Sequence, residues 1–136
     1  LITGDSEAIP FESNTFDAIT VGFGVRNFAD INKGLNEMCR VLKPNGMLVV
    51  LEFSKPKAFP VKQAYQFYFS TILPLIGRMI SKHDTAYSYL PDSVEKFPEG
   101  EVFLEMMKTN GFSAVKQIPL TFGIASLYIG HKQAVQ

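Results

Sequence analysis

The sequence predicts an α/β fold, because two apolar runs typical of buried strands flank an amphipathic helical pattern. The first run covers Ala18 to Phe23, and the second covers Met47 to Phe53. Between them, apolar residues recur at spacings of three and four, as on one face of a helix. A strand, a helix and a strand joined by short connections form a βαβ unit, whose two strands pair in parallel.

The helix of this unit has clear start and stop signals. Asp30 is expected to cap it, and its apolar face is Ile31, Leu35, Met38, Cys39 and Leu42. The Lys43 to Gly46 segment (K-P-N-G) is expected to end the helix and turn the chain. The following run, Met47 to Phe53, is almost continuously apolar, as expected of a parallel strand that is covered on both faces.

The middle of the chain predicts a long helix from Val61 to Ile80 that is apolar nearly all round. Lys62, Arg78 and several uncharged polar residues interrupt it, which argues against a membrane span. A buried or lid-forming helix with a kink near Pro74 fits the pattern better.

The last third predicts one helix and a β-hairpin. Pro98 is expected to open the helix, Glu101 lies in its first turn, and Lys108 lies in its last turn before Asn110-Gly111. Two strands follow, at about 114–120 and 125–132. The loop between them is too short for a helical crossover, so the strands should pair antiparallel.

Composition excludes several classes of protein. The 136 residues suffice for about one domain, and 13 basic residues balance 13 acidic ones, which gives no basic surface for nucleic acid. The single cysteine, Cys39, excludes a disulfide framework and a cysteine-based zinc site and fits a reducing cytosol, so we expect no metal. The first residues show no secretory signal and no initiating methionine, and we expect the sequence to begin inside a longer protein.

Several motifs resemble one family of enzymes. They are G-D-S-E-A-I-P-F at 4–11, N-T-F-D at 14–17, G-F-G-V-R-N at 22–27, R-V-L-K-P-N-G at 40–46 and L-E-F-S-K-P at 51–56. Together they are similar to the class I S-adenosylmethionine-dependent methyltransferases, and more narrowly to the UbiE-type C-methyltransferases of ubiquinone and menaquinone biosynthesis. The R-V-L-K-P turn is common to many methyltransferases, whereas the combination of F-G-x-R-N at 23–27 with L-E-F-S-x-P at 51–56 is more specific.

The resemblance implies the carboxy-terminal half of a doubly wound, Rossmann-like sheet that ends in an antiparallel hairpin. Family members carry an earlier glycine-rich turn that holds the cofactor, and this sequence has none. We therefore expect residues 1–136 to be a partial methyltransferase domain, with residues 57–97 as a lid over the substrate. Alone, the chain should bind S-adenosylmethionine weakly or not at all.

The resemblance also assigns cofactor-binding residues. Asp5 and Ser6 match positions that meet the adenine end of S-adenosylmethionine, although Gly-Asp-Ser is also ordinary turn chemistry. Gly22 matches a small residue beside the cofactor at the end of a strand, where it allows close backbone approach.

Arg26 and Asn27 are the candidate catalytic residues, because they follow the carboxyl end of a strand, where open α/β sheets bind ligands. Methylation of a hydroquinone ring carbon requires a phenolate, which the Arg26 cation could stabilise while Asn27 orients a hydroxyl group. The alternative is a structural arginine that pairs with Asp30 or Glu52.

Four aromatic residues are candidates for substrate binding: Tyr65, Phe69, Tyr87 and Tyr89. The first two could equally belong to the core. His83 has a suitable pKa for a general base, but a lone histidine between charged residues is more often on the surface, and His131 is expected to be structural.

The predicted function is methyl transfer from S-adenosylmethionine to a ring carbon of a prenylated demethylquinol. A non-catalytic oligomerising or regulatory module, and a methyltransferase for another apolar small molecule, remain alternatives. We expect a cytoplasmic protein that meets the membrane surface at its lipid substrate, with no nucleic-acid partner. Because one strand would lose its neighbour and its covering helices, we also expect a homodimer.

Overall fold

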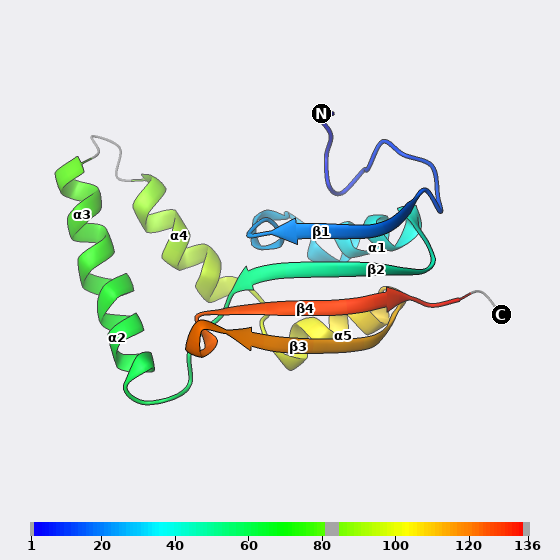
Figure 1. Cartoon of the computed structure of the whole chain (residues 1–136). Coiled ribbons are helices and arrows are strands. Elements are labelled where there is room, and N and C mark those ends of the chain that lie inside the picture. Colours follow the sequence, from blue (N-terminus) through cyan, green and yellow to red (C-terminus); the bar gives the residue numbers. More distant parts are fainter. Residues whose placement is uncertain (1, 81–84, 135–136) are drawn as a thin grey trace.

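The computed structural model describes residues 2–80 and 85–134, and it confirms the predicted α/β class (Figure 1). The strands are β1 (Phe16–Gly22), β2 (Leu42–Phe53), β3 (Phe112–Leu120) and β4 (Ala125–Lys132). The helices are α1 (Ile31–Val41), α2 (Val61–Phe67), α3 (Leu73–Ile80), α4 (Thr85–Lys96) and α5 (Glu101–Thr109).

The four strands form one mixed sheet in the order β1-β2-β4-β3. β1 pairs with β2 in parallel across α1, which confirms the predicted βαβ unit. β3 and β4 pair antiparallel, as their short connection predicts. The last strand, β4, also pairs antiparallel with β2, so it lies inside the sheet between two strands that precede it in the sequence.

The predicted turn at Lys43 to Gly46 lies within β2, which begins earlier than predicted. Leu42 pairs with Phe16, and the next pair joins Met47 to Ala18, so the intervening residues bulge out of the ladder. Asn45 adopts a left-handed φ of 64° there, a conformation that asparagine tolerates. A side chain at Gly46 would place its Cβ 2.8 Å from the Lys43 carbonyl oxygen, so only glycine fits the bulge.

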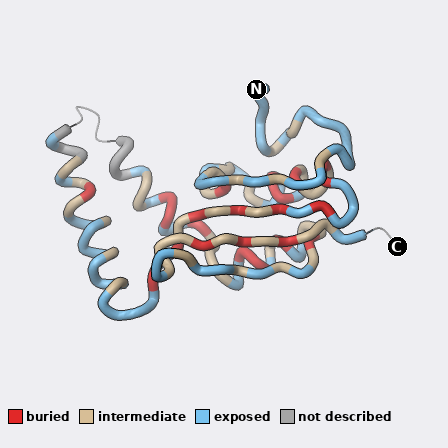
Figure 2. The backbone as a smooth tube through the Cα atoms, in the orientation of Figure 1, coloured by how far each residue is buried: buried red, intermediate tan, exposed pale blue. Residues whose placement is uncertain are grey.

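The core lies between the sheet and two helices on the same face. Every second residue of β2 points into it, and Leu48 and Val50 are fully buried (Figure 2). Leu35 and Met38 come from α1, whose apolar stripe and Asp30 cap were predicted, and the Asp30 carboxylate accepts a hydrogen bond from the Lys33 amide. The helix side of the core also contains Phe103, Leu104, Met107, Phe112 and Tyr128.

The strand at Met47–Phe53 was predicted to be covered on both faces, but among the described residues helices cover one face only, and the opposite, apolar face carries none (Figure 1). The alternate residues of β2 point to this face, where Met47 is 37% exposed and Leu51 is half-buried. Ile118 on β3 is 38% exposed. We call this surface the open face: Met47, Val49, Leu51 and Phe53 from β2, Leu127 and Ile129 from β4, and Ile118 from β3.

The predicted helix at Val61–Ile80 is present, and it stands with α4 beyond the carboxyl ends of β1 and β2 (Figure 1). It contains a π-helical turn at Tyr68–Ile72, where the Leu73 amide donates to the Tyr68 carbonyl oxygen. Pro74 lacks an amide hydrogen, so a local change of helical pattern next to it is expected. No helix in the described part of the chain has the length and apolar character to cross a membrane.

Two boundaries in the last third differ from the prediction. The helix expected to open at Pro98 begins at Glu101, because Gly100 has a φ of 69°, which a right-handed helix excludes. Glu101 in its first turn and Lys108 in its last are confirmed. β3 begins at Phe112, two residues before the predicted strand.

Candidate active site

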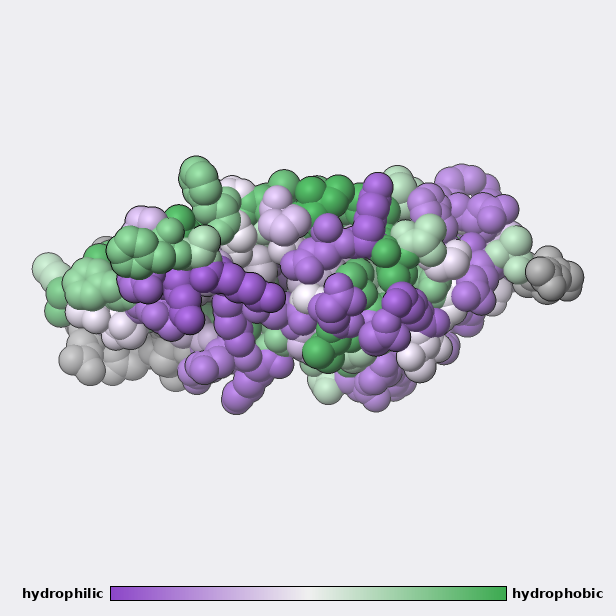
Figure 3. All heavy atoms as spheres, turned by 90° about the horizontal axis from the view of Figure 1, so that it is seen from below, coloured by the Kyte–Doolittle hydropathy of each residue, from purple (hydrophilic) through white to green (hydrophobic). Residues whose placement is uncertain are grey.

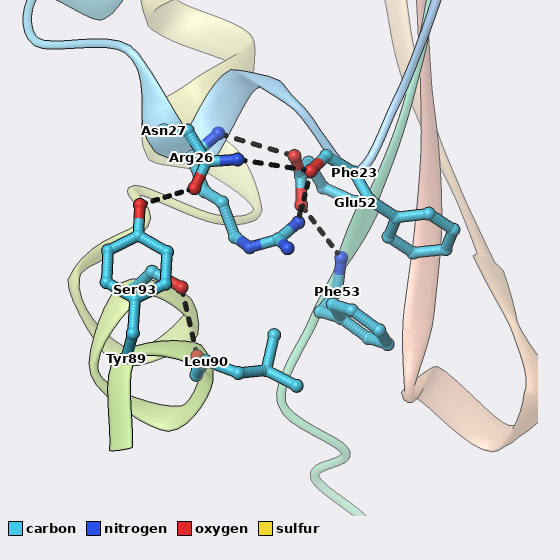
Figure 4. A network of polar contacts seen from close by, with 8 residues as sticks. All are labelled: Phe23, Arg26, Asn27, Glu52, Phe53, Tyr89, Leu90 and Ser93. Atoms are coloured by element: carbon cyan, nitrogen blue, oxygen red, sulfur yellow. Dashed lines mark hydrogen bonds and ion pairs between the residues drawn. The ribbon is translucent and has the colours of Figure 1, made fainter. Parts of the chain in front are cut away.

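The polar pair Arg26-Asn27 lies on a short 3₁₀ turn, Val25–Asn27, directly after β1 (Figure 4). Phe23 leaves the strand with a φ of 55°, and its amide donates to the Leu51 carbonyl oxygen at 2.7 Å. Val25 is fully buried and anchors the turn in the core. The turn therefore has a fixed position at the carboxyl end of the sheet, where open α/β sheets bind ligands.

Arg26 forms a buried ion pair with Glu52 on the neighbouring strand. Arg26 Nη1 lies 3.0 Å from Glu52 Oε2, and the two side chains are 11% and 0% exposed. The Arg26 backbone amide also donates to Glu52 Oε1 at 3.3 Å. Of the two structural partners considered from the sequence, Glu52 is the one present, whereas Asp30 caps α1. Removal of either charge would leave the other buried without a counter-charge.

This ion pair does not use all the donors of the guanidinium group. Nη1 also donates to the Phe23 carbonyl oxygen at 2.5 Å, while Nε is buried and has no hydrogen-bond partner among the described residues. The Phe53 ring lies 5.4 Å from Arg26 Cζ, within the range of a cation–π contact. Buried donors in proteins are normally satisfied, so an incompletely paired guanidinium suits recognition of an oxyanion.

Asn27 connects the turn after β1 to helix α4. Its Oδ1 accepts a 2.6 Å hydrogen bond from the Tyr89 hydroxyl group, and its Nδ2 lies 3.5 Å from the Phe23 carbonyl oxygen (Figure 4). The structure thus brings together one predicted catalytic residue and one predicted substrate-binding residue from positions 62 residues apart. The bond fixes which end of the Asn27 amide faces α4.

Tyr65 and Phe69 lie elsewhere, in a groove of about 670 Å³. One wall of the groove is α2 with the π-helical turn that follows it, and the other wall is α4. Their rings stack with centroids 4.4 Å apart. The Tyr65 hydroxyl group is buried and has no partner among the described residues. Burial, with Glu99 nearby, raises the pKa of Tyr65 to about 12, so it remains protonated at neutral pH. Arg26 and Asn27 do not line this groove, so the predicted substrate residues occupy two places.

Two candidates fall wholly or partly outside the described residues. His83 lies in the segment 81–84, which the structure does not describe, and the backbone of Tyr87 lies in α4 but its side chain is outside the description.

His131 is on β4, with Nδ1 3.4 Å from the Asn45 carbonyl oxygen. No metal-ligating cluster occurs within residues 2–80 and 85–134.

Asp5 and Ser6 line a second, smaller pocket of about 220 Å³ beside β1. Asp5 Oδ1 accepts the Glu7 amide at 2.8 Å, which is the turn chemistry considered from the sequence, but its carboxylate still borders the pocket. The other walls are largely apolar and include Ile19, Val21 and Phe28. An apolar slot with one carboxylate at its mouth can hold a flat heteroaromatic ring and accept hydrogen bonds from its amino group.

The loop that carries Asp5 is attached to α1 by an ion pair that the sequence reasoning missed. Arg40 donates to both Glu37 oxygens at 2.8 Å, and it also donates to the carbonyl oxygens of Ile9 and Phe11. The Arg40 hydrogen bonds lower the pKa of Glu37 to about 2. The i, i+3 spacing of glutamate and arginine on the predicted helix was the available signal.

Gly22 ends β1 beside Phe23, and space around it is open. A Cβ built on Gly22 would meet no atom within 4 Å. Packing within this chain therefore does not require glycine at this position, and a ligand could approach the backbone closely.

Comparison with known proteins identifies relatives of this chain. Residues 1–132 match the ubiE/COQ5 methyltransferase family. The chain is 48% identical to a demethylmenaquinone methyltransferase of Bacteroides fragilis over 128 residues, covering 94% of this chain and 52% of that protein. It is 50% identical to the ubiquinone/menaquinone biosynthesis C-methyltransferase UbiE of Geobacter sulfurreducens, covering 93% of this chain and 49% of that protein. The chain thus spans about half the length of these curated relatives.

Solved structures show the same fold. A SAM-dependent methyltransferase from Thermotoga maritima, described as a possible histamine N-methyltransferase, superposes with a TM-score of 0.65 at 17% identity, covering 97% of this chain and 63% of that one. The CurJ carbon methyltransferase gives a TM-score of 0.62 at 19% identity, covering 96% of this chain and 34% of that one. The fold is therefore the carboxy-terminal part of a class I S-adenosylmethionine-dependent methyltransferase sheet, and the chain belongs to the ubiE/COQ5 methyltransferase family.

Proposed function

We propose that this chain forms the substrate-side half of an enzyme that transfers a methyl group from S-adenosylmethionine to a ring carbon of a prenylated demethylquinol. The observation that carries this proposal is the incompletely paired Arg26 guanidinium at the carboxyl end of β1. The names of relatives that are about half identical to the chain support a quinol as the substrate class.

The pocket residues fit the adenosine part of the cofactor. Asp5 and Ser6 border an apolar slot, and Gly22 leaves open space at the end of β1. We assign Asp5 to the adenine amino group, with Ser6 beside it and Gly22 in backbone contact with the ligand. When bound, S-adenosylmethionine supplies the electrophilic methyl group.

Arg26 stabilises the phenolate that activates the ring carbon. Its charge is held in place by Glu52, so little reorganisation is needed when negative charge develops on the substrate oxygen. An arginine is too basic to accept the phenolic proton, and we assign deprotonation to water or another group. Asn27, oriented by Tyr89, holds a quinol hydroxyl group.

The helices within residues 57–97 form the cover over the substrate. The groove beside α4 has an aromatic and aliphatic part formed by Tyr65, Phe69, Pro91 and Val94, which suits an isoprenoid chain. Charged residues line the rest of it: Lys55, Lys57, Lys62, Glu95 and Glu99. Tyr87 belongs to the same proposed cover by its position in α4.

The test is reconstitution, because the chain spans about half of its relatives. Joined to the amino-terminal half of the Bacteroides fragilis relative, the chain should methylate demethylmenaquinol, with S-adenosylhomocysteine and the methylated quinol as products. The chain alone should show no micromolar binding of S-adenosylhomocysteine by isothermal titration, and tight binding would contradict its proposed dependence on the other half.

Arg26 is tested in the same fusion. Arg26→Lys keeps a positive charge beside Glu52 but loses the planar donor array, so kcat should fall by more than tenfold while cofactor affinity changes little. An unchanged kcat with weakened cofactor binding would refute the assignment. A folded fusion that methylates a different apolar acceptor but not the quinol would support the alternative substrate class.

A further inference from the structure

The Asp5 loop, which we define as residues 2–11, lies beside the free edge of β1 (Figure 1). It carries Asp5 and Ser6, two of the three residues proposed to contact the cofactor. The later part of the loop is held to α1 by the ion pair between Glu37 and Arg40. A second attachment holds the part that contains Asp5 and Ser6.

Glu7 makes this second attachment, and its side chain is half-buried. Its Oε1 atom accepts hydrogen bonds from the backbone amides of Ala29 at 2.7 Å and Asp30 at 3.0 Å. Among the described residues, no other hydrogen bond joins residues 2–8 to the rest of the chain. The place of this part of the loop relative to α1 therefore depends on one carboxylate.

The backbone of Glu7 also orients the Asp5 carboxylate. The Glu7 amide donates to Asp5 Oδ1 at 2.8 Å, and the Ala8 amide donates to the Asp5 carbonyl oxygen at 3.1 Å, which closes a turn. Asp5 Oδ2 accepts no hydrogen bond from the residues that the structure describes, so it is the oxygen left to accept one from a ligand. Glu7 thus connects the carboxylate at the pocket to the segment before α1.

The segment to which Glu7 is attached has a fixed position. Asp30 caps α1, and its carbonyl oxygen accepts the Gly34 amide at 3.1 Å. Phe28 packs so closely on α1 that a Cβ built on Gly34 would overlap its ring. Phe28 lines the same pocket as Asp5. The Asp5 loop and the segment with Phe28 are therefore two walls of one pocket, and Glu7 joins them.

The proposed catalytic turn has anchors that do not pass through Glu7. Val25 is fully buried, and the Arg26 charge is held by Glu52 on β2. Loss of the Glu7 side chain should therefore release the Asp5 loop while the Arg26 guanidinium group stays in place.

We propose that Glu7 is a positioning residue for the cofactor, because it holds the Asp5 carboxylate at the pocket before the ligand binds. This role rests on the proposed cofactor site at Asp5. A segment that must become ordered on binding lowers the affinity for the ligand, and a segment that is already ordered avoids this cost. Glu7 should therefore affect the affinity for the cofactor, and it should have little effect on the rate of methyl transfer.

Three substitutions separate the hydrogen bonds of Glu7 from its charge. Glu7→Ala removes both. Glu7→Asp keeps the charge but shortens the side chain by one methylene group, so the carboxylate no longer reaches the two amides. Glu7→Gln loses the charge but keeps an oxygen acceptor at the same reach. Glu7→Asp also carries the prediction if Glu7→Ala does not fold.

The measurement is isothermal titration of the reconstituted fusion with S-adenosylhomocysteine. The Kd should rise about tenfold in Glu7→Ala and Glu7→Asp and should stay within about threefold in Glu7→Gln. At saturating S-adenosylmethionine, kcat should change by less than about twofold in all three variants. Hydrogen exchange of residues 2–8 in the fusion without ligand should become faster in the first two variants only.

Two other carboxylates serve as matched controls. Glu12 is exposed just after the Asp5 loop, and its side chain makes no hydrogen bond to the described residues. Glu105 is exposed on α5, which packs beside β3. Many surface side chains are hydrophilic on the β3 side of the molecule (Figure 3). Glu12→Ala and Glu105→Ala should both leave the Kd unchanged.

Each other outcome has a defined meaning. An unchanged Kd in Glu7→Ala would overturn the proposal, and so would an equal loss of affinity in Glu7→Gln and Glu7→Ala, because charge alone would then explain the effect. A lower kcat with an unchanged Kd would assign Glu7 to the catalytic turn and would also overturn it. A folded fusion that binds no S-adenosylhomocysteine would remove the pocket and this role together. If the Kd values follow the prediction but the fusion does not methylate the quinol, the proposed substrate fails while the role of Glu7 stands.

Discussion

The hydroxyl group of Tyr89 donates a 2.6 Å hydrogen bond to Oδ1 of Asn27, which joins helix α4 to the turn after β1. Asn27 is adjacent to Arg26, whose charge is held by Glu52. The position of α4 and the orientation of the polar pair are therefore linked. A movement of α4 would break this bond and free the Asn27 amide to rotate. A change in the position of the proposed substrate cover would therefore change the orientation of a proposed catalytic residue.

Tyr89→Phe removes this bond and should loosen the start of α4. Because Tyr89 is 52% exposed, we expect a loss of only about 0.5–1.5 kcal/mol in the free energy of unfolding. Amide hydrogen exchange in α4 should increase, while exchange in α5 stays unchanged. Tyr68→Phe is the control, since Tyr68 is 43% exposed and its hydroxyl group makes no hydrogen bond to the described residues. Unchanged exchange in α4 would show that the bond does not position the helix.

Arg26→Ala should destabilise the chain strongly, because it leaves the Glu52 carboxylate fully buried without its partner. The expected cost is about 3–5 kcal/mol in the free energy of unfolding by urea. The double variant Arg26→Met/Glu52→Leu should recover most of this loss. Lys43→Ala breaks the exposed pair with Asp17 and should cost at most about 1 kcal/mol. Equal effects of Arg26→Ala and Lys43→Ala would contradict the buried-pair argument.

The Glu37–Arg40 pair should make the Asp5 loop sensitive to acid. The pKa of Glu37 is lowered from 4.5 to about 2, so the folded state favours the ionised carboxylate. Its stabilising contribution is complete above about pH 4.5 and is lost as the pH falls towards 2. The Ile9 amide, which donates to Glu37 Oε2 at 2.9 Å, reports this step by NMR. Glu37→Gln should abolish the step, whereas Glu105→Gln should leave it in place.

Gly130 and Gly22 differ in how closely other atoms of the chain surround them. A Cβ at Gly130 would lie 2.8 Å from Met107 Cε and 3.2 Å from Phe112 Cβ, so Gly130→Ala should cost about 1–3 kcal/mol in thermal unfolding. A Cβ at Gly22 meets nothing within 4 Å, and Gly22→Ala should change stability by less than about 0.5 kcal/mol. In the reconstituted fusion, Gly22→Ala should weaken cofactor binding. Normal binding would remove Gly22 from the proposed cofactor site.

The chain alone should associate with itself through the open face and the free edge of β1. Unpaired strand edges and uncovered apolar sheet faces both favour contact with another chain. Light scattering after size exclusion should show a dimer or larger species at tens of micromolar. Val49→Lys/Leu127→Lys places charges on the open face and should favour the monomer. A monomeric peak for the unchanged chain, with cooperative thermal unfolding, would contradict this prediction.

The local signals in the sequence predicted most of the fold. Asp30 as a cap, the two apolar runs that became β1 and β2, and the short loop before β4 each depend on neighbouring residues, and each is confirmed. The pairing of Phe16 with Leu42, which moves the start of β2, depends on residues far apart and has no local signal. Helix α4 was not predicted, because it contains Pro91 and has a weak apolar pattern.

The sequence predicted where the candidate site lies on the sheet, but it did not predict which side chains contact one another there. The rule that ligands bind at the carboxyl ends of strands places Arg26 correctly relative to β1. The choice of Glu52 over Asp30 as its partner depends on the register of β1 against β2, which the sequence does not encode locally. The separation of Tyr65 from Tyr89 depends in the same way on how α2 and α4 pack.

The position of β4 has a consequence for biosynthesis. A ribosome releases β2 and β3 before residues 125–132 have been translated, yet in the finished sheet these two strands are separated by β4. Until then, the nascent chain cannot complete its central ladder, and Tyr128 is not available to pack against Phe103. Translational arrest or truncation before residue 125 should therefore leave a chain that chaperones retain and proteases remove.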